Sequence, residues 1–288
     1  MKGIVLAGGK GTRLYPTTKA VSKQLLPVYD KPMIFYPIAT LMAAGIREIL
    51  IITTPDDIHL FKKLLGDGNQ IGVTFEYEIQ PKPNGLAEAF KIGKAFSAGS
   101  SVALILGDNI FHGTGLGREL SKYREISGAQ IFAYKVANPQ DYGVIEFSKN
   151  GEIKSISEKP LQPKSQFAIP GLYFYDASVF DMVESIQPSA RGELQITSLN
   201  ERYLEKGRLQ ASILPRGTAW FDTGTFESLQ DASSYVRILE TRQDMQVACL
   251  EEISWRLGWI TTEQLNSLAC RAEDSNLQTY LLDLVNGD

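Results

Sequence analysis

Short apolar, β-branched runs alternate with amphipathic segments over the first 140 residues. The apolar runs predict strands at Lys2–Ala7, Glu48–Thr53, Thr74–Ile79, Val102–Leu106 and Gln130–Val136. The amphipathic segments predict helices at Ile34–Ala44, Asp57–Leu65, Leu86–Phe96 and Leu116–Ser127. Because strands alternate with helices, we expect an α/β fold: a mainly parallel, Rossmann-like mixed sheet flanked by helices. The continuous apolar character of these strands suits a sheet that is covered on both faces.

The pattern changes after residue 140. Tyr142–Phe147 and Glu152–Ser157 flank an Asn-Gly pair, which is typical of a β-hairpin. Further segments predict strands at Ala168–Tyr175 and Leu209–Leu214, and helices at Ala177–Ser185 and Leu194–Lys206. From about Phe226 onward the apolar spacing is helical. We therefore expect an α/β domain over residues 1–225 and a C-terminal helical appendage over residues 226–288.

Composition narrows the functional classes. The chain has 288 residues, 43% hydrophobic content, a net charge of -4 and a pI near 5.4. This balance argues against nucleic-acid binding and against attachment to an anionic membrane. Apolar runs are all shorter than the roughly 20 residues that a transmembrane helix needs. The N-terminus leads directly into a strand rather than a signal peptide, so we expect a cytoplasmic protein with two free thiols, Cys249 and Cys270.

A glycine-rich loop follows the first predicted strand, with Gly8, Gly9 and Gly11 ahead of Arg13. Exposed N–H groups of such a loop can bind a polyphosphate, and arginine adds a bidentate donor. The dinucleotide-binding fingerprint fails because Leu14 stands where its last glycine should be. The P-loop pattern also fails, since no glycine stands five residues before Gly9. On the glycines alone, an ordinary glycine-rich turn remains an alternative.

Two aspartates are candidates for a metal site. Asp108 follows the predicted strand Val102–Leu106, and the carboxyl ends of strands are where ligands bind in open α/β sheets. Asp222 stands more than a hundred residues later, in a Trp-Phe-Asp-Thr-Gly stretch. Magnesium usually needs only one or two carboxylates in addition to phosphate oxygens and water. Judged alone, each aspartate could also serve as a turn or helix-capping residue.

Taken together, the motifs resemble those of the sugar nucleotidyltransferases, and especially the bacterial branch that joins dTTP to glucose 1-phosphate. The matching stretches follow family order over about 220 residues: Leu6–Leu14, Pro16-Thr17, Lys23, Leu26–Val28, Lys31–Met33, Gln80–Ala87, Gly107–Asn109, Glu158–Pro160 and Trp220–Thr225. The resemblance implies a magnesium-dependent nucleotidyl transfer. It also implies a nucleotide-binding part at about 1–110 and a sugar-binding part at about 111–225.

The resemblance also implies roles for individual residues. The nucleotide would be bound by Gly8, Gly11, Thr12, Arg13, Lys23, Gln24, Gln80, Gly85 and Leu86. The sugar phosphate would be bound by Asn109, Gly143, Glu158, Lys159 and Ile169, where we would expect valine in place of Ile169. Tyr142 and Trp220 either line this pocket or belong to the core. Asp108 and Asp222 would hold the metal, and the catalytic set would be Arg13, Lys23, Lys159 and Asp108.

The predicted chemistry is an in-line displacement at the α-phosphorus of dTTP. The attacking phosphate oxygen is already anionic, so no general base is needed. This agrees with a chain whose two histidines, His59 and His112, both read as loop or surface residues. The glutamine amide of Gln80 carries a donor and an acceptor, which fits the edge of thymine. A family member that uses UTP, CTP or GTP is the alternative. A silent regulatory subunit would be expected to lack Arg13, Lys23, Asp108 or Asp222.

The resemblance also bears on assembly and regulation. It implies a homotetramer that performs the first step of dTDP-rhamnose synthesis. In the family, related C-terminal helices contribute to tetramer contacts and to a site for feedback inhibition, here expected for dTDP-rhamnose. The segment from Glu251-Glu252-Ile253 through Trp255-Arg256 matches that region. The alternative interpretation of this segment is an amphipathic helix that covers the sheet.

Overall fold

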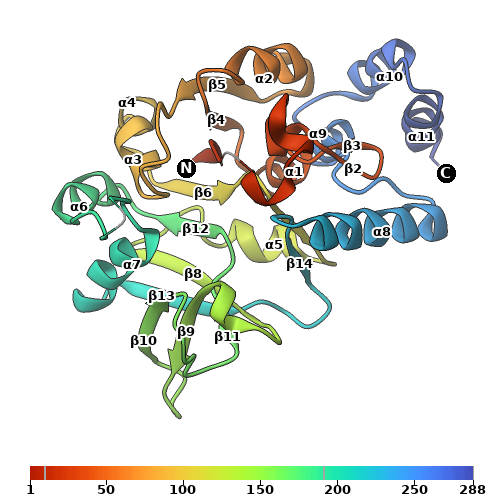
Figure 1. Ribbon diagram of the computed structural model, residues 1–288. Helices are drawn as coiled ribbons and strands as arrows, with labels where there is room; N and C mark the ends of the chain where they lie inside the picture. Colours follow the sequence, from red (N-terminus) through yellow and green to blue (C-terminus); the bar gives the residue numbers. More distant parts are fainter. Residues whose placement is uncertain (10, 191, 288) are drawn as a thin grey trace.

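The computed structural model describes residues 1–9, 11–190 and 192–287, so Lys10 of the glycine-rich loop lies outside the described residues. Within them, the chain forms a mixed sheet of 10 strands flanked by helices (Figure 1). The strand order is β10-β9-β11-β8-β12-β6-β1-β4-β5, and β13 pairs with β8. The α/β fold predicted from the sequence is therefore confirmed.

The N-terminal half of the sheet is parallel. It consists of β1 (Lys2–Ala7), β4 (Glu48–Thr53), β5 (Thr74–Ile79) and β6 (Val102–Leu106), with β1 at its centre between β4 and β6. Successive residues of β1 point to opposite faces, so Ile4 and Leu6 join one buried cluster while Val5 and Ala7 join the other. A strand buried on both faces must be apolar throughout, which explains the continuous apolar runs in the sequence.

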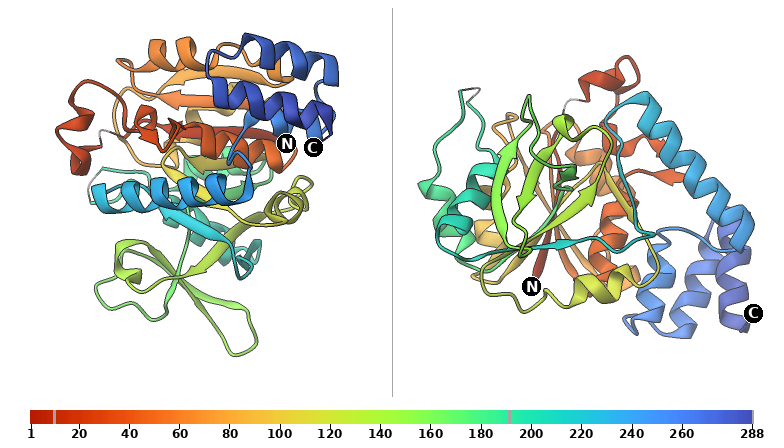
Figure 2. Two further views of the ribbon diagram at one scale, coloured as in Figure 1. Left: turned by 90° about the vertical axis from the view of Figure 1, so that its right-hand side faces the viewer. Right: turned by 90° about the horizontal axis from the view of Figure 1, so that it is seen from below.

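The second half of the sheet is mostly antiparallel. Strand β12 (Leu172–Tyr175) pairs antiparallel with both β6 and β8 (Ala129–Lys135). The hairpin formed by β9 (Gly143–Phe147) and β10 (Ile153–Glu158) continues the sheet through the short β11 (Phe167–Ala168). Strand β13 (Leu209–Ile213) runs parallel to β8. In both figures this hairpin projects from the sheet on the side away from the C-terminal helices (Figures 1 and 2).

Helices cover both faces of the sheet. Apolar side chains of α3 (Glu88–Ile92), α6 (Val179–Ser185) and α7 (Ile196–Glu205) belong to the cluster on one face. Those of α1 (Phe35–Ala43), α2 (Ile58–Leu65) and α5 (Leu116–Ser121) belong to the cluster on the other. The remaining short helix, α4 (Lys94–Ser97), follows α3. None of the helices in these described ranges combines the length and the apolarity that a membrane crossing requires.

Two small ladders lie outside the main sheet. Strands β7 (Asn109–His112) and β14 (Ala219–Asp222) pair antiparallel, which places Asp222 opposite Asn109. Strands β2 (Pro27–Val28) and β3 (Lys31–Pro32) form the other ladder. The β7–β14 ladder matters for function because it brings two segments that are more than a hundred residues apart to one place.

The C-terminal region is helical, as expected. It contains α8 (Phe226–Gln243), α9 (Leu250–Arg256), α10 (Thr262–Arg271) and α11 (Ser275–Asn286) (Figure 2). Capping boxes at Thr225 and Thr261 begin α8 and α10. Leu250 of α9 belongs to the main core, and Ser254 donates a hydrogen bond to the carbonyl of Ile71. These contacts attach the helical region to the sheet.

The structure corrects several details of the prediction. The helix expected at Leu86–Phe96 is interrupted at Gly93, where a Cβ would lie only 2.8 Å from Cδ1 of Ile4. The helix expected at Leu116–Ser127 ends at Ser121.

The strand expected at Ala168–Tyr175 is divided between β11 and β12. Pro170 has no N–H to donate, and Gly171 donates its own to the side chain of Asn109. His112 lies in β7 rather than in a loop, half-buried and 2.9 Å from the hydroxyl of Tyr235. Both β7 and β14 were missed from the sequence.

Candidate active site

The glycine-rich loop leaves β1 beside the end of β5. A Cβ on Gly8 would lie 2.8 Å from Oε1 of Gln80, so only glycine lets the loop approach this amide. Gly11 has a φ of 59°, a left-handed conformation that glycine adopts without strain. The hydroxyl of Thr18 donates to the carbonyl of Gly11 at 2.9 Å. These contacts fix the loop at the carboxyl edge of the sheet.

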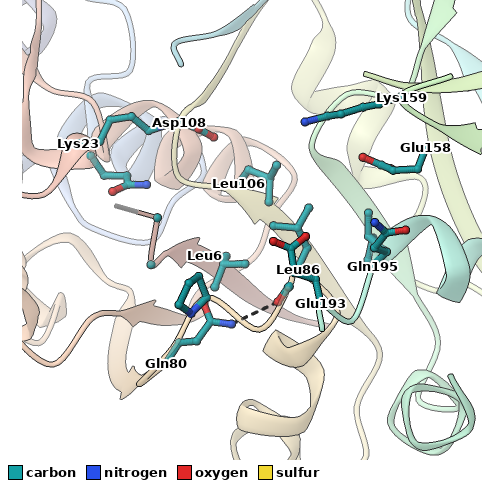
Figure 3. A pocket seen from close by; sticks show the side chains of 16 residues that line it. Leu6, Lys23, Gln80, Leu86, Leu106, Asp108, Glu158, Lys159, Glu193 and Gln195 are labelled. Carbon is teal, nitrogen blue, oxygen red and sulfur yellow. Dashed lines mark hydrogen bonds and ion pairs between the residues drawn. The ribbon is translucent and has the colours of Figure 1, made fainter. Parts of the chain in front are cut away.

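A cavity of about 320 Å³ opens beside this loop (Figure 3). The predicted site residues that line it are Gly8, Lys23, Gln24, Gln80, Gly85, Leu86, Asp108, Glu158 and Lys159. Figure 3 shows Gln80 at one side of the cavity and Glu158 with Lys159 at the other. The walls also include Leu6 of the first motif, together with Leu106, Glu193, Gln195 and Ile196, which the sequence did not single out.

The amide of Gln80 is oriented by its neighbours. Its Nε2 donates to Oε2 of Glu88 at 2.7 Å and to the carbonyl of Gly85 at 3.2 Å. Glu88 is itself held by Nδ2 of Asn84 at 2.8 Å. Because both amide hydrogens are engaged, Gln80 can offer a ligand only its carbonyl oxygen. At this position the cavity wall therefore presents an acceptor, which suits an N–H group on the edge of a ligand.

A second cavity of about 130 Å³ adjoins the first. The predicted residues that line it are Leu86, Asn109, Tyr142, Gly143, Glu158, Lys159, Ile169, Trp220 and Asp222. Both cavities share Leu86, Leu106, Glu158, Lys159 and Ile196 as lining residues, so they form one continuous site. Tyr142 and Trp220 both line this cavity, with ring centroids 5.1 Å apart. Trp220 also belongs to the apolar cluster on one face of the sheet, and Tyr142 packs against that cluster.

The hairpin end presents Glu158 and Lys159 to this site. Lys159 has a φ of 40°, which is rare for a non-glycine residue, and its N–H donates to the carbonyl of Tyr142 at 3.1 Å. The buried hydroxyl of Thr197 donates to Oε2 of Glu158. Thr197 was missed because nothing in its sequence context, the start of α7, distinguishes it from an ordinary helical residue.

Backbone contacts shape the same wall. The N–H of Ile169 donates to the carbonyl of Gly143 at 2.7 Å. The atoms nearest to a Cβ built on Gly143 would be Oε2 of Glu158 at 3.6 Å and Oγ1 of Thr197 at 3.7 Å, so the strand passes close to these polar groups. Ile169 is buried, and its side chain lines the cavity. The replacement of valine by isoleucine therefore leaves the backbone contact in place.

Asp108 at the end of β6 forms an ion pair with the buried Lys23. The Nζ of Lys23, on the short helix η3 (Lys23–Leu25), contacts Oδ2 of Asp108. Burial favours the neutral acid, but the charge and hydrogen bond of Lys23 hold the pKa of Asp108 below its ordinary value. Asp108 is therefore an anion at neutral pH, ready to bind a cation.

Asp222 completes a pair of carboxylates. Its strand is held to the Asp108 segment because Thr223 donates its N–H and its hydroxyl to the carbonyl of Asp108, at 3.0 and 2.7 Å. Burial and the nearby charge of Asp108 raise the pKa of Asp222 to about 6. Two half-buried carboxylates that repel each other suit a divalent cation, and oxygen donors are those that magnesium prefers. The described residues contain no cluster of three or more metal-ligating side chains, so phosphate and water would have to complete the coordination.

Asn109 links the carboxylates to the second cavity. Its Nδ2 donates to Oδ1 of Asp108 at 3.0 Å. Its Oδ1 accepts from the indole N–H of Trp220 at 2.7 Å and from the N–H of Gly171 at 3.0 Å. Only one amide hydrogen remains for a ligand. Asn109 therefore fixes the orientation of Asp108 as well as lining the cavity.

The remaining residues of the predicted phosphate-binding group lie outside these two cavities. Thr12 lines a neighbouring groove of about 1060 Å³, which shares Gly8, Gly9 and Gln80 with the first cavity. Gly11 and Arg13 line neither of the two cavities. The charge of Arg13 does reach Asp222 and Tyr142, since it acts on the pKa values of both. The guanidinium therefore lies on the carboxylate side of the site.

The chain is similar to known proteins over most of its length. The family profile described as nucleotidyl transferase matches residues 2–237. A glucose-1-phosphate thymidylyltransferase of Mycobacterium tuberculosis is 56% identical over 285 residues, with 99% of each chain covered. A solved structure from Bacillus anthracis, provisionally assigned to the same activity and bound to a sucrose, aligns with a TM-score of 0.76 at 39% identity. It covers 82% of this chain and 95% of its own. A UDP-glucose pyrophosphorylase complexed with UDP-glucose aligns with a TM-score of 0.73 at 26% identity, over 82% of this chain and 98% of its own.

Proposed function

The chain belongs to the nucleotidyl transferase family, and we propose that it joins dTTP to glucose 1-phosphate, giving dTDP-glucose and diphosphate. One observation carries the proposal: two adjoining cavities share Glu158 and Lys159, with Asp108 lining one and Asp222 the other. A reaction that joins two ligands needs such a site, whereas a simple binding protein needs only one pocket. The product would supply dTDP-rhamnose synthesis in the cytoplasm.

In the proposed reaction, a phosphate oxygen of glucose 1-phosphate attacks the α-phosphorus of dTTP. The new O–P bond forms as the bond to the diphosphate leaving group breaks. Because the nucleophile is already anionic, catalysis rests on positioning and charge. Lys159 would orient the attacking phosphate, and Lys23 would stabilise negative charge at the α-phosphate. Arg13 would neutralise the departing diphosphate together with the loop of Gly8, Gly11 and Thr12.

Asp108 and Asp222 would hold the Mg²⁺ ion. When bound, the ion supplies positive charge that offsets the phosphates. Lys23, which is paired with Asp108, could turn to a phosphate oxygen once a cation takes over that carboxylate. The sugar would lie against Trp220 and Tyr142, with Glu158 accepting from its hydroxyl groups.

The choice of nucleotide would depend on the Gln80 acceptor. This oxygen suits the N3–H of thymine, which uracil shares, while Gly85 and Leu86 complete that wall of the cavity. The two bases differ by one methyl group, worth about 1–3 kcal/mol in an apolar pocket. A UTP-using enzyme is therefore the second candidate, and the similarity to a UDP-glucose pyrophosphorylase favours it over an enzyme that uses CTP or GTP.

The direct test is diphosphate release from dTTP, UTP, CTP and GTP in parallel, each with Mg²⁺ and glucose 1-phosphate. We expect dTTP to have the highest kcat/KM and UTP to follow. A higher value for UTP would replace the proposed nucleotide but keep the reaction. If no nucleotide reacts with glucose 1-phosphate, the proposal is wrong.

We also propose that the enzyme is a homotetramer inhibited by dTDP-rhamnose at a separate site. The proposal rests on the resemblance of the Glu251–Arg256 segment to the region that carries such a site in the family. Ile253 of this segment lines an apolar cavity of about 140 Å³ between α1, α5 and α9. An Ile253→Asp variant should lose inhibition while its uninhibited rate stays near wild type. Light scattering tests the assembly. If the rate is unchanged at saturating dTDP-rhamnose, the proposed inhibition is wrong, and α9 is an amphipathic helix that covers the sheet.

A further inference from the structure

The contact between Arg13 and the backbone of Gly224 joins the phosphate-binding loop to the segment that carries Asp222. A Cβ built on Gly224 would lie 2.4 Å from Nη2 of Arg13 and 3.0 Å from its Cζ. Real Cβ atoms do not approach other heavy atoms so closely. The guanidinium therefore occupies space that exists only because residue 224 has no side chain.

The reason for a glycine here is space rather than backbone conformation. Gly224 is buried, and its φ does not lie in the left-handed region that favours glycine. Alanine could adopt the same backbone without strain. A Cβ at residue 224 would clash with the guanidinium of Arg13, which is the end of a long, flexible and exposed side chain. Arg13 could therefore move aside at little cost to the stability of the fold.

We propose that Gly224 is a positioning residue: because it has no side chain, the guanidinium of Arg13 can lie beside Asp222. This inference rests on the proposed function, in which Arg13 neutralises the departing diphosphate. A methyl group at residue 224 would displace the guanidinium from this position. It would also lie 3.1 Å from Oδ1 of Asp222, a tight contact that small movements relieve. The main effect falls on Arg13, because 2.4 Å is far shorter than 3.1 Å.

The test is a double-mutant cycle with Gly224→Ala and Arg13→Ala. Gly224→Ala should keep the thermal midpoint within about 2 °C of wild type, since no core packing is lost. Its kcat should fall roughly tenfold to a hundredfold, as expected when a charge-neutralising group is misplaced by about an ångström. The KM for glucose 1-phosphate should not change. Calorimetry should show weaker dTTP binding.

The cycle separates the possible causes. If Gly224 acts through Arg13, adding Gly224→Ala to Arg13→Ala should change kcat less than about twofold. A loss that persists in full in the Arg13→Ala background would assign the effect to Asp222 and overturn the proposal. A silent Gly224→Ala beside a crippled Arg13→Ala would also overturn it, while leaving the proposed function intact. Wild-type turnover in Arg13→Ala would instead contradict the role proposed for that arginine.

Discussion

The two halves of the site are built in different ways. In the part proposed to bind the nucleotide, here called the nucleotide half, Gly8, Gln80 and Asp108 each follow a strand of the parallel sheet directly or after one glycine. In the part proposed to bind the sugar phosphate, here called the sugar half, Glu158 ends a hairpin strand and Trp220 lies on a separate two-stranded ladder. Thr197 donates a side-chain hydrogen bond to Glu158, and the indole N–H of Trp220 donates one to Asn109, which holds these two residues in place. The first half is thus positioned by backbone topology, and the second by contacts between distant elements.

This difference predicts which substitutions should alter the use of each substrate. Substitutions in the hairpin and in α7 should alter the use of glucose 1-phosphate alone, whereas those at the shared carboxylates should affect the whole reaction. We expect the loss of activity to be largest for substitutions of the carboxylates and smallest for those in the outer wall of the sugar cavity.

The largest loss is expected from Asp222→Asn, which tests the junction of the two halves. Turnover should fall at least about a hundredfold, because one of two carboxylates that would hold the cation becomes neutral. Stability should not fall. The folded-state pKa of Asp222 is raised to about 6, so the folded state disfavours the charged form that exists at pH 7. Initial rates and thermal melting check both statements, and wild-type turnover would remove Asp222 from the metal site.

Lys159→Ala should separate the two ligands. Losing a charge-assisted hydrogen bond to phosphate costs about 1.5–3 kcal/mol, or roughly tenfold to a hundredfold in the KM for glucose 1-phosphate. The KM for dTTP should stay close to wild type. Steady-state kinetics with each substrate varied in turn would measure this split. Equal losses for both substrates would contradict the assignment of Lys159 to the sugar phosphate.

Thr197→Val should produce a smaller effect of the same kind. Valine keeps the shape of the side chain but removes the hydroxyl that orients Glu158. Glu158 itself remains, so only its orientation is lost. At the net value of about 1 kcal/mol for a typical hydrogen bond, the KM for glucose 1-phosphate should rise roughly fivefold. Serine is the matched control, because Thr197→Ser retains the hydroxyl and should stay near wild type. A rise in the KM for dTTP would contradict the assignment of Thr197 to the sugar half.

The smallest effect is expected from Ile169→Val. The contact of Ile169 with Gly143 is made by its backbone N–H, which valine keeps. Loss of one buried methylene group should cost about 0.5–1.5 kcal/mol of stability. The KM for glucose 1-phosphate should change less than about threefold. A thermal melt and one kinetic series suffice, and a large kinetic effect would show that the isoleucine side chain selects the sugar.

The same contrast explains what the sequence could predict. The strands that carry the nucleotide half were found with their boundaries. The buried strands β1 and β6 are continuously apolar, and β5 is a short run of β-branched and aromatic residues alternating with glutamates. Thr197, Glu193 and Gln195 were missed because their roles depend on where α7 and the segment before it meet the sheet. Strands β7 and β14 are four residues each, too short to show a period, although they bring Asp222 opposite Asn109.

Isotope tracing tests the central claim most directly. The chain would be incubated with Mg²⁺, dTTP and glucose 1-phosphate carrying ¹⁸O in its phosphate, and the products analysed by mass spectrometry. Attack by the sugar phosphate on the α-phosphorus predicts that all of the label appears in dTDP-glucose and none in diphosphate. Label in the diphosphate, or a failure to form dTDP-glucose, would contradict the account.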